Sequence, residues 1–221
     1  MPDIGHSPQL APLPGPQTFD AYADAFAHFV DSQGLATADL IGSSVGGRLV
    51  LELTRRGIGR HCVALDPGGF WQGRETRWFH WTLAASIRLV RLLRPFHPEL
   101  SRYAITRTLS LAQLSARPWL LPPHLVESEL ECLAATSVFD ATLRELARGP
   151  IQQGSALTPG RVTIGWGQSD HLLLPRQTER ALTAFPSAKL HWFERCGHFP
   201  HWDQPADTAN LILNTVNGHD G

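Results

Sequence analysis

The 221-residue sequence contains few cysteines, and their spacing excludes two common uses of this residue. The three cysteines, Cys62, Cys132 and Cys196, lie far apart and form no C-x-x-C pair. They therefore indicate neither a disulfide framework nor a zinc knuckle. We expect a cytoplasmic protein in which each cysteine is a small buried side chain.

An excess of charge of one sign is also missing, and so is any long hydrophobic run. The 19 Lys and Arg residues nearly balance the 20 Asp and Glu residues, which argues against general attraction to nucleic acid. The longest apolar stretch, 78–93, is interrupted by His80, Arg88 and Arg91, and is too short to span a bilayer. The first residues lack the features of a signal peptide. We expect neither a nucleic-acid partner nor stable membrane insertion, and the oligomeric state stays open.

The sequence does contain a G-x-S-x-G pattern, at 42–46, between an apolar strand pattern and a helical one. Such a turn lifts a serine hydroxyl above the edge of a sheet, so Ser44 is a candidate nucleophile. Gly42 and Gly46 would permit the strained turn and the close approach of the helix. The alternative is an ordinary Gly/Ser turn in which Ser43 or Ser44 caps the following helix.

An acidic residue and a histidine, the two partners that a serine nucleophile needs, follow Ser44 in the chain. Asp170 comes shortly after one predicted strand, and His198 comes shortly after the next. Serine, acid, histidine is the chain order of the α/β-hydrolase triad, in which the acid orients the histidine that accepts the serine proton. The alternative interpretation of Asp170 is a turn residue that caps the following helix. The alternative interpretation of His198 is a histidine on a surface loop.

Neighbouring residues offer weaker candidates for the same roles. His171 and His201 are the nearest rivals of His198, whereas Glu194 and Asp203 are less well placed than Asp170. The spacing of His198 and His201 suits a metal pair, but we expect Pro200 to prevent a helix there, and no third ligand is evident. We therefore predict neither a metal nor a cofactor.

The order of predicted elements indicates an α/β protein. Predicted strands and helices alternate at both ends of the chain, which favours a parallel sheet with helices on both faces. The strands are expected over 38–41, 61–65, 161–166 and 188–193, and the helices over 18–33, 47–56, 176–185 and 204–216. The middle of the chain has no strand signal, and helices are expected there over 76–94, 98–114 and 123–148. We therefore divide the chain into core residues 1–70, a helical cap at 71–150 and core residues 151–221.

Four segments resemble motifs of the α/β-hydrolase superfamily. Residues 42–47 (GSSVGG) resemble its nucleophile elbow, 165–170 (GWGQSD) its acid loop and 197–205 (GHFPHWDQP) its histidine loop. Residues 3–7 (DIGHS) resemble a shortened form of the loop after its fourth strand. The resemblance implies that the backbone N–H of Val45 is one oxyanion donor.

The resemblance also implies that this is an N-terminally truncated form of the fold. In the family, about four strands precede the segment that residues 3–7 resemble, and they include the turn that supplies the second oxyanion donor. We therefore expect this sequence to be part of a longer hydrolase, with the elbow strand as an exposed sheet edge. The alternative is a natural remnant with weak or no catalysis.

A serine nucleophile narrows the reactions that the resemblance allows. The dehalogenase and epoxide-hydrolase branches carry aspartate in the elbow, which leaves esterases, lipases, lactonases, thioesterases, carbon–carbon bond hydrolases and cofactor-free haloperoxidases. We predict hydrolysis of a small or medium apolar carboxylic ester through an acyl-enzyme, with Ser44, Asp170 and His198 as the triad. A carbon–carbon bond hydrolase and a noncatalytic ligand-binding domain are the alternatives.

Overall fold

The computed structural model describes residues 18–136 and 149–218, and these fall into two compact units. The sheet unit comprises Tyr22–Trp71, Gln113–Ala116 and Pro150–Gly221, and the helical unit comprises the other residues. Four residues from the middle of the expected cap, Gln113–Ala116, thus group with the sheet. The division at residues 70 and 150 stays a prediction.

The sheet unit contains four parallel strands in the order β1-β2-β3-β4. The strands are β1 (Leu40–Ser43), β2 (Cys62–Leu65), β3 (Val162–Gly167) and β4 (Lys189–Phe193). Every residue of β2 and β3 is buried, which explains the absence of charged residues from both strands. Because the strands are parallel, the residues that follow them meet at one edge of the sheet.

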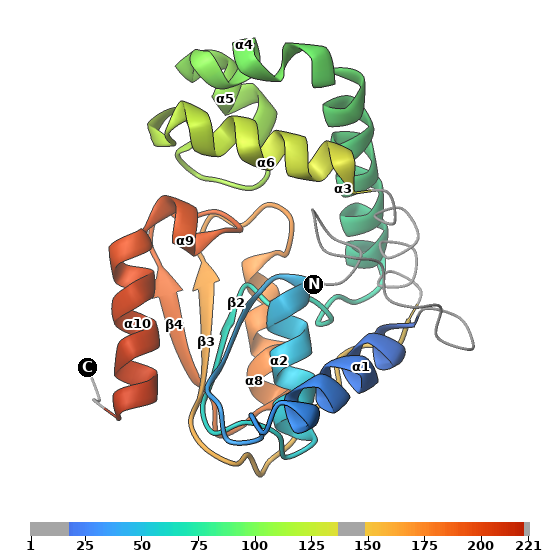
Figure 1. The fold of residues 1–221 in the computed structure, drawn as a ribbon, viewed down its shortest axis with the longest axis vertical. Coiled ribbons are helices and arrows are strands. Elements are labelled where there is room, and N and C mark those ends of the chain that lie inside the picture. The colour runs from blue at the N-terminus through green and yellow to red at the C-terminus, as the bar shows by residue number, and fades with distance from the viewer. Residues whose placement is uncertain (1–17, 137–148, 219–221) are drawn as a thin grey trace. The chain divides into compact units, whose positions relative to one another are not determined.

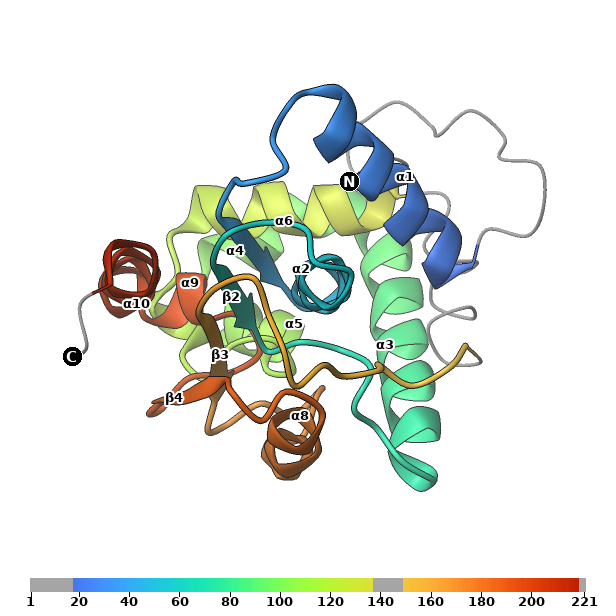
Figure 2. The same cartoon turned by 90° about the horizontal axis from the view of Figure 1, so that it is seen from below.

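Helices cover both faces of this sheet (Figures 1 and 2). Helix α10 (Pro205–Asn217) packs on the face that carries Val63, Leu65 and Phe193. Helices α2 (Val45–Arg55) and α8 (Thr178–Ala184) lie on the opposite face. This is the α/β layering that the alternating sequence pattern predicted.

The helical unit contains α3 (Arg74–Leu92), α4 (His97–Arg102), α5 (Ala104–Leu111) and α6 (Pro123–Ala135), with short 3₁₀ turns at Arg94–Phe96 and Pro118–Leu120. The side chain of Arg107 donates to the carbonyl oxygens of Ser101, Arg102 and Trp119, and so ties the end of α4 to the turn at Pro118–Leu120. Throughout residues 18–136 and 149–218, each helix falls short of the length or the apolar character needed to cross a membrane.

Two expectations about helix boundaries were wrong. The single helix expected over 98–114 is divided at Tyr103, whose backbone is extended, while Pro98 lies within the first turn of α4. Pro200 was expected to prevent a helix, but it begins the short helix α9 (Pro200–Asp203). Proline suits the first helical positions because the N–H that it lacks has no partner there.

The remaining expected elements agree to within a few residues. Helix α1 (Phe19–Ser32) begins as predicted, with the Thr18 hydroxyl accepting the N–H of Ala21 at 3.2 Å. The motif at 3–7 and the end of the helix expected over 123–148 lie outside the described residues.

Candidate active site

The turn between β1 and α2 places Ser44 at the carboxyl end of the sheet. Its backbone has φ 57° and ψ −116°, a region that residues with a side chain rarely occupy. Two hydrogen bonds fix this strained residue, from the Ser44 N–H to Leu65 O at 2.9 Å and from the Gly68 N–H to Ser44 O at 3.2 Å. Strain of this kind persists only where the surrounding structure holds it, and it is concentrated at functional sites.

The elbow needs glycine at position 42, but the expected packing role of Gly46 was wrong. A Cβ on Gly42 would fall 2.2 Å from Gly46 O, whereas a Cβ on Gly46 would meet no atom of the described residues within 4 Å. The close approach lies one residue later, because a Cβ on Gly47 would be 3.1 Å from Leu65 O. Gly47 therefore brings α2 against the end of β2.

Ser44, His198 and Asp170 form a hydrogen-bonded chain. Asp170 Oδ2 lies 2.8 Å from His198 Nδ1, and His198 Nε2 lies 2.8 Å from Ser44 Oγ. Because a carboxylate only accepts, Nδ1 carries the proton of a neutral imidazole, and Nε2 can accept the proton of the serine. The sequence predicted these three residues together, and the structure brings them into contact.

The structure also tests the alternatives for these residues. Ser44 makes no side-chain capping bond to α2, and the Ser43 hydroxyl is buried with no hydrogen-bond partner among the described residues, so neither serine caps the helix. Asp170 does serve its turn, since Oδ1 accepts the N–H groups of Leu172 at 2.8 Å and Leu173 at 2.9 Å. The turn and the bond to His198 use different carboxylate oxygens.

Asp203, expected only as a weaker acid, holds the backbone next to His198 instead. Its Oδ2 accepts the N–H of Gly197 at 2.7 Å and the N–H of Ala116 at 2.8 Å, and its Oδ1 accepts the hydroxyl of Ser115. A further bond joins the Phe199 N–H to Leu114 O at 3.2 Å. Asp203 thus fastens the histidine loop to residues 113–116.

Of the two rival histidines, His201 lies near this loop and does not replace His198 in the bond to Ser44. Burial lowers the pKa of His201, and the nearby His198 lowers it further. The backbone oxygen of Glu194, the other weaker acid, accepts a hydrogen bond from the Gln204 side chain. No bond from either residue to Ser44 is found among the described residues.

A fourth residue, Asp66, was missed and lies beside the chain. It follows β2 directly and is fully buried. Its Oδ1 accepts a hydrogen bond from the Gly167 N–H at 2.9 Å. Burial raises its pKa well above the usual range, and the Asp170 charge raises it further. Its position was readable from the sequence, since residues after adjacent parallel strands share one sheet edge.

Asp66, Asp170 and His198 are also the described residues that could together hold a metal ion. Ligand atoms of Asp66, Asp170 and His198 lie within 4.8 Å of one another. However, His198 Nδ1 and Asp170 Oδ2 are already hydrogen-bonded at 2.8 Å, so a metal would have to break the contact that orients the imidazole. The absence of a metal stays a prediction, and this competition is an argument for it.

Val45 is suited to the oxyanion role that the resemblance implied for it. It is the first residue of α2, and the N–H groups of a helix's first turn have no partner inside the helix. The positive end of the helix dipole adds to the attraction for an anion at this point.

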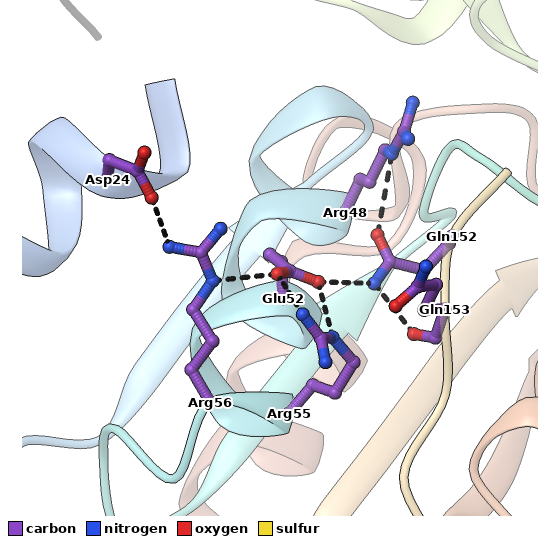
Figure 3. Close-up of polar contacts among 7 residues, drawn as sticks. All are labelled: Asp24, Arg48, Glu52, Arg55, Arg56, Gln152 and Gln153. Atoms are coloured by element: carbon purple, nitrogen blue, oxygen red, sulfur yellow. Dashed lines mark hydrogen bonds and ion pairs between the residues drawn. The ribbon is translucent and has the colours of Figure 1, made fainter. Parts of the chain in front are cut away.

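A polar network around the buried Glu52 holds α2 behind the nucleophile (Figure 3). Glu52 accepts hydrogen bonds from Arg55, Arg56 and Gln152, and Arg56 also reaches Asp24 on α1. Burial alone would raise the pKa of Glu52, but these donors outweigh it and lower the pKa to about 2.

Arg48, one turn beyond Ser44, connects the same network to the chain that returns to β3. It is buried and donates to Pro150 O at 2.6 Å and to Gln152 Oε1 at 3.4 Å. The position of α2, and with it the start of the helix at Val45, is therefore fixed by charged groups as well as by apolar packing.

Known proteins agree with this architecture. The chain is 24% identical over 205 residues to the epoxide hydrolase EphH of Mycobacterium tuberculosis, covering 88% of this chain and 92% of that protein. It is 24% identical over 201 residues to a 2-hydroxy-6-oxononadienedioate/2-hydroxy-6-oxononatrienedioate hydrolase of Pseudomonas sp., covering 88% of this chain and 68% of the relative.

Solved structures share the fold. A thermophilic esterase from Thermogutta terrifontis superposes with a TM-score of 0.71 at 18% identity, covering 99% of this chain and 78% of the esterase. A family model described as the alpha/beta hydrolase family matches residues 1–211. The strained serine elbow, the parallel sheet and this match over nearly the whole sequence lead to one conclusion: the chain belongs to the α/β hydrolase family.

Proposed function

We propose that the chain hydrolyses a small or medium apolar carboxylic ester through an acyl-enzyme. Ser44 Oγ attacks the carbonyl carbon while His198 Nε2 takes its proton, and Asp170 orients the imidazole and stabilises the imidazolium. The N–H of Val45 donates to the developing oxyanion. His198 then protonates the leaving alcohol, and water, activated by the same histidine, releases the acid. The contacts of 2.8 Å on both sides of the imidazole carry this proposal.

A serine nucleophile favours an ester over an epoxide as the substrate. A serine that attacks an ester forms an acyl ester, which water hydrolyses in the second step. A serine that opened an epoxide would instead form an ether, and water does not cleave an ether at a useful rate. The similarity to an epoxide hydrolase therefore supports the family but not that reaction for Ser44.

Carbon–carbon bond hydrolysis is the second candidate, because one relative is named as a hydrolase of a 2-hydroxy-6-oxo acid. The same triad would serve, but the leaving group would be a carbon atom that must receive a proton. A noncatalytic ligand-binding domain is the third candidate. It predicts ligand-induced stabilisation that persists in Ser44→Ala, without any product.

The test uses a serine-reactive fluorophosphonate probe on the purified 221-residue chain. We expect labelling of the wild type and of Ser43→Ala, and none of Ser44→Ala. Ser43→Ala is a matched control because its hydroxyl has no partner among the described residues. Labelling that persists in Ser44→Ala, or a folded wild type that is not labelled, would contradict the proposal.

Two substrates then separate the catalytic candidates. A p-nitrophenyl ester of a short fatty acid reports esterase activity, and a 2-hydroxy-6-oxo dienoate reports carbon–carbon cleavage. The ester hypothesis predicts the higher kcat/KM on the ester, with both activities lost in Ser44→Ala. A preference for the dienoate would transfer the proposal to the second candidate. The cap role of residues 71–150 and a cytoplasmic location stay predictions.

A further inference from the structure

Asp66 is a buried carboxyl group that the proposed reaction does not use. It lies at the end of β2 with a backbone φ of 42°, a strained value for a residue with a side chain. Ligand atoms of Asp66, Asp170 and His198 all lie within 4.8 Å of one another, and all three residues are buried. Two carboxyl groups therefore share the space beside one imidazole.

The hydrogen bonds around Asp66 are incomplete if it is ionised. Its Oδ1 accepts the N–H of Gly167, but its buried Oδ2 has no donor among the described residues. The carboxyl group of Asp170 is a hydrogen-bonding neighbour of Asp66, yet two carboxylates offer only acceptors to each other. A proton on Oδ2 removes the conflict, because Oδ2 then donates to Asp170.

The donors on each side decide which of the two carboxyl groups keeps the proton. Asp170 accepts the N–H groups of Leu172 and Leu173 and the Nδ1–H of His198, and all three stabilise its anion. Asp66 accepts only one N–H group among the described residues, from Gly167. Asp203, which is also acidic, acts on Asp66 in the same direction as Asp170 and favours a neutral Asp66.

We propose that Asp66 carries a proton at the pH of catalysis and donates it in a hydrogen bond to Asp170, as a positioning residue for the triad. The pair then holds one negative charge, which stays on the carboxylate that faces His198. The bond also joins the end of β2 to the acid loop after β3. This inference rests on the proposed function, because it assigns Asp170 the task of orienting His198.

The first test compares Asp66→Asn with Asp66→Ala. Asparagine keeps both bonds, since its oxygen can accept from Gly167 and its amide can donate to Asp170. We expect kcat to fall by no more than about threefold in Asp66→Asn and by about tenfold in Asp66→Ala, which loses the donor to a charged acceptor. Asp207→Asn, at an exposed carboxylate in the same unit, is the matched control and should leave kcat unchanged.

The pH profile provides a readout that a merely structural role would not move. If Asp66 is neutral, Asp66→Asn removes no charge, and the acid limb of kcat/KM stays where it is in the wild type. If Asp66 were ionised, the substitution would remove an anion beside the imidazole. The imidazolium would then be less stable, and the acid limb would move to lower pH by about one unit or more. Such a shift would overturn the inference.

Infrared spectroscopy tests the proton without relying on activity. The wild type should show the carbonyl stretch of a protonated carboxylic acid at neutral pH, and this band should disappear in Asp66→Asn and persist in Asp207→Asn. An active wild type without the band would refute the role of Asp66 and leave the proposed function intact. An inactive wild type with the band would refute the proposed function and leave the proton on Asp66.

Discussion

Substituting Asp203 by asparagine should separate the support of the histidine loop from the triad itself. In the wild type, the carboxylate accepts the N–H groups of Gly197 and Ala116 and the hydroxyl of Ser115. An amide has one oxygen in place of two, so its NH₂ group would face at least one of these donors. The substitution changes no atom of Ser44 or His198.

The magnitude follows from the bonds that are lost. A hydrogen bond to a charged acceptor contributes about 1.5–3 kcal/mol, and a buried donor left unpaired costs about 1–3 kcal/mol. Because Asp203 is only 8% exposed, water replaces few of the hydrogen bonds that the substitution removes. Allowing for relaxation of the loop, we expect Asp203→Asn to lower the free energy of unfolding by about 3 kcal/mol. Since Gly197 precedes His198, kcat should fall at least about tenfold with little change in KM.

Two assays check this prediction. Urea unfolding followed by tryptophan fluorescence gives the change in stability, and ester hydrolysis or the rate of fluorophosphonate labelling gives the change in reactivity. Asp207→Asn is the matched control, because Asp207 is an exposed carboxylate in the first turn of α10. A loss below about 0.5 kcal/mol together with an unchanged kcat would show that Asp203 does not hold the histidine loop.

Two further predictions concern the elbow and the helix that follows it. Glu52 has a pKa of about 2 in the folded chain, against its usual 4.5. Its ionised form therefore adds about 3 kcal/mol to the free energy of unfolding above pH 4.5, and this stability is lost as the pH falls toward 2. Glu52→Gln should therefore flatten the pH dependence of urea stability in that interval, and an unchanged slope would contradict the network. Gly42→Ala should abolish soluble folded protein or fluorophosphonate labelling, because its Cβ would lie 2.2 Å from Gly46 O. Gly46→Ala should retain labelling, because its Cβ would meet no atom of the described residues within 4 Å. Equal behaviour of the two variants would refute this packing argument.

The sequence predicted the triad because its signals are local. Each of Ser44, Asp170 and His198 follows its own strand, and parallel strands deliver such residues to one edge of the sheet. The same reasoning applied to Asp66, but its neighbours Pro67 and Gly68 suggested only a break in the chain. What the sequence did not contain was the distance between the two carboxyl groups, which depends on the register of β2 with β3.

Other features depend on contacts between distant segments and were not predictable from local pattern. The close approach of α2 occurs at Gly47 and not at Gly46, because it is set by where Leu65 O lies. The role of Asp203 depends on residues 115 and 116, nearly ninety positions earlier in the chain. Tyr103 divides the helix expected over 98–114 although no proline or glycine marks the division.

The grouping of Gln113–Ala116 with the sheet unit has a consequence for engineering this chain. An exchange of residues 71–150 for the insertion of another family member would remove Ser115 and Ala116, and with them two of the three donors that hold Asp203. A chimera that exchanges only 72–112 and 117–149 would retain both donors. A hybrid therefore needs four crossover points instead of two, so that residues 113–116 of this chain are kept in every hybrid.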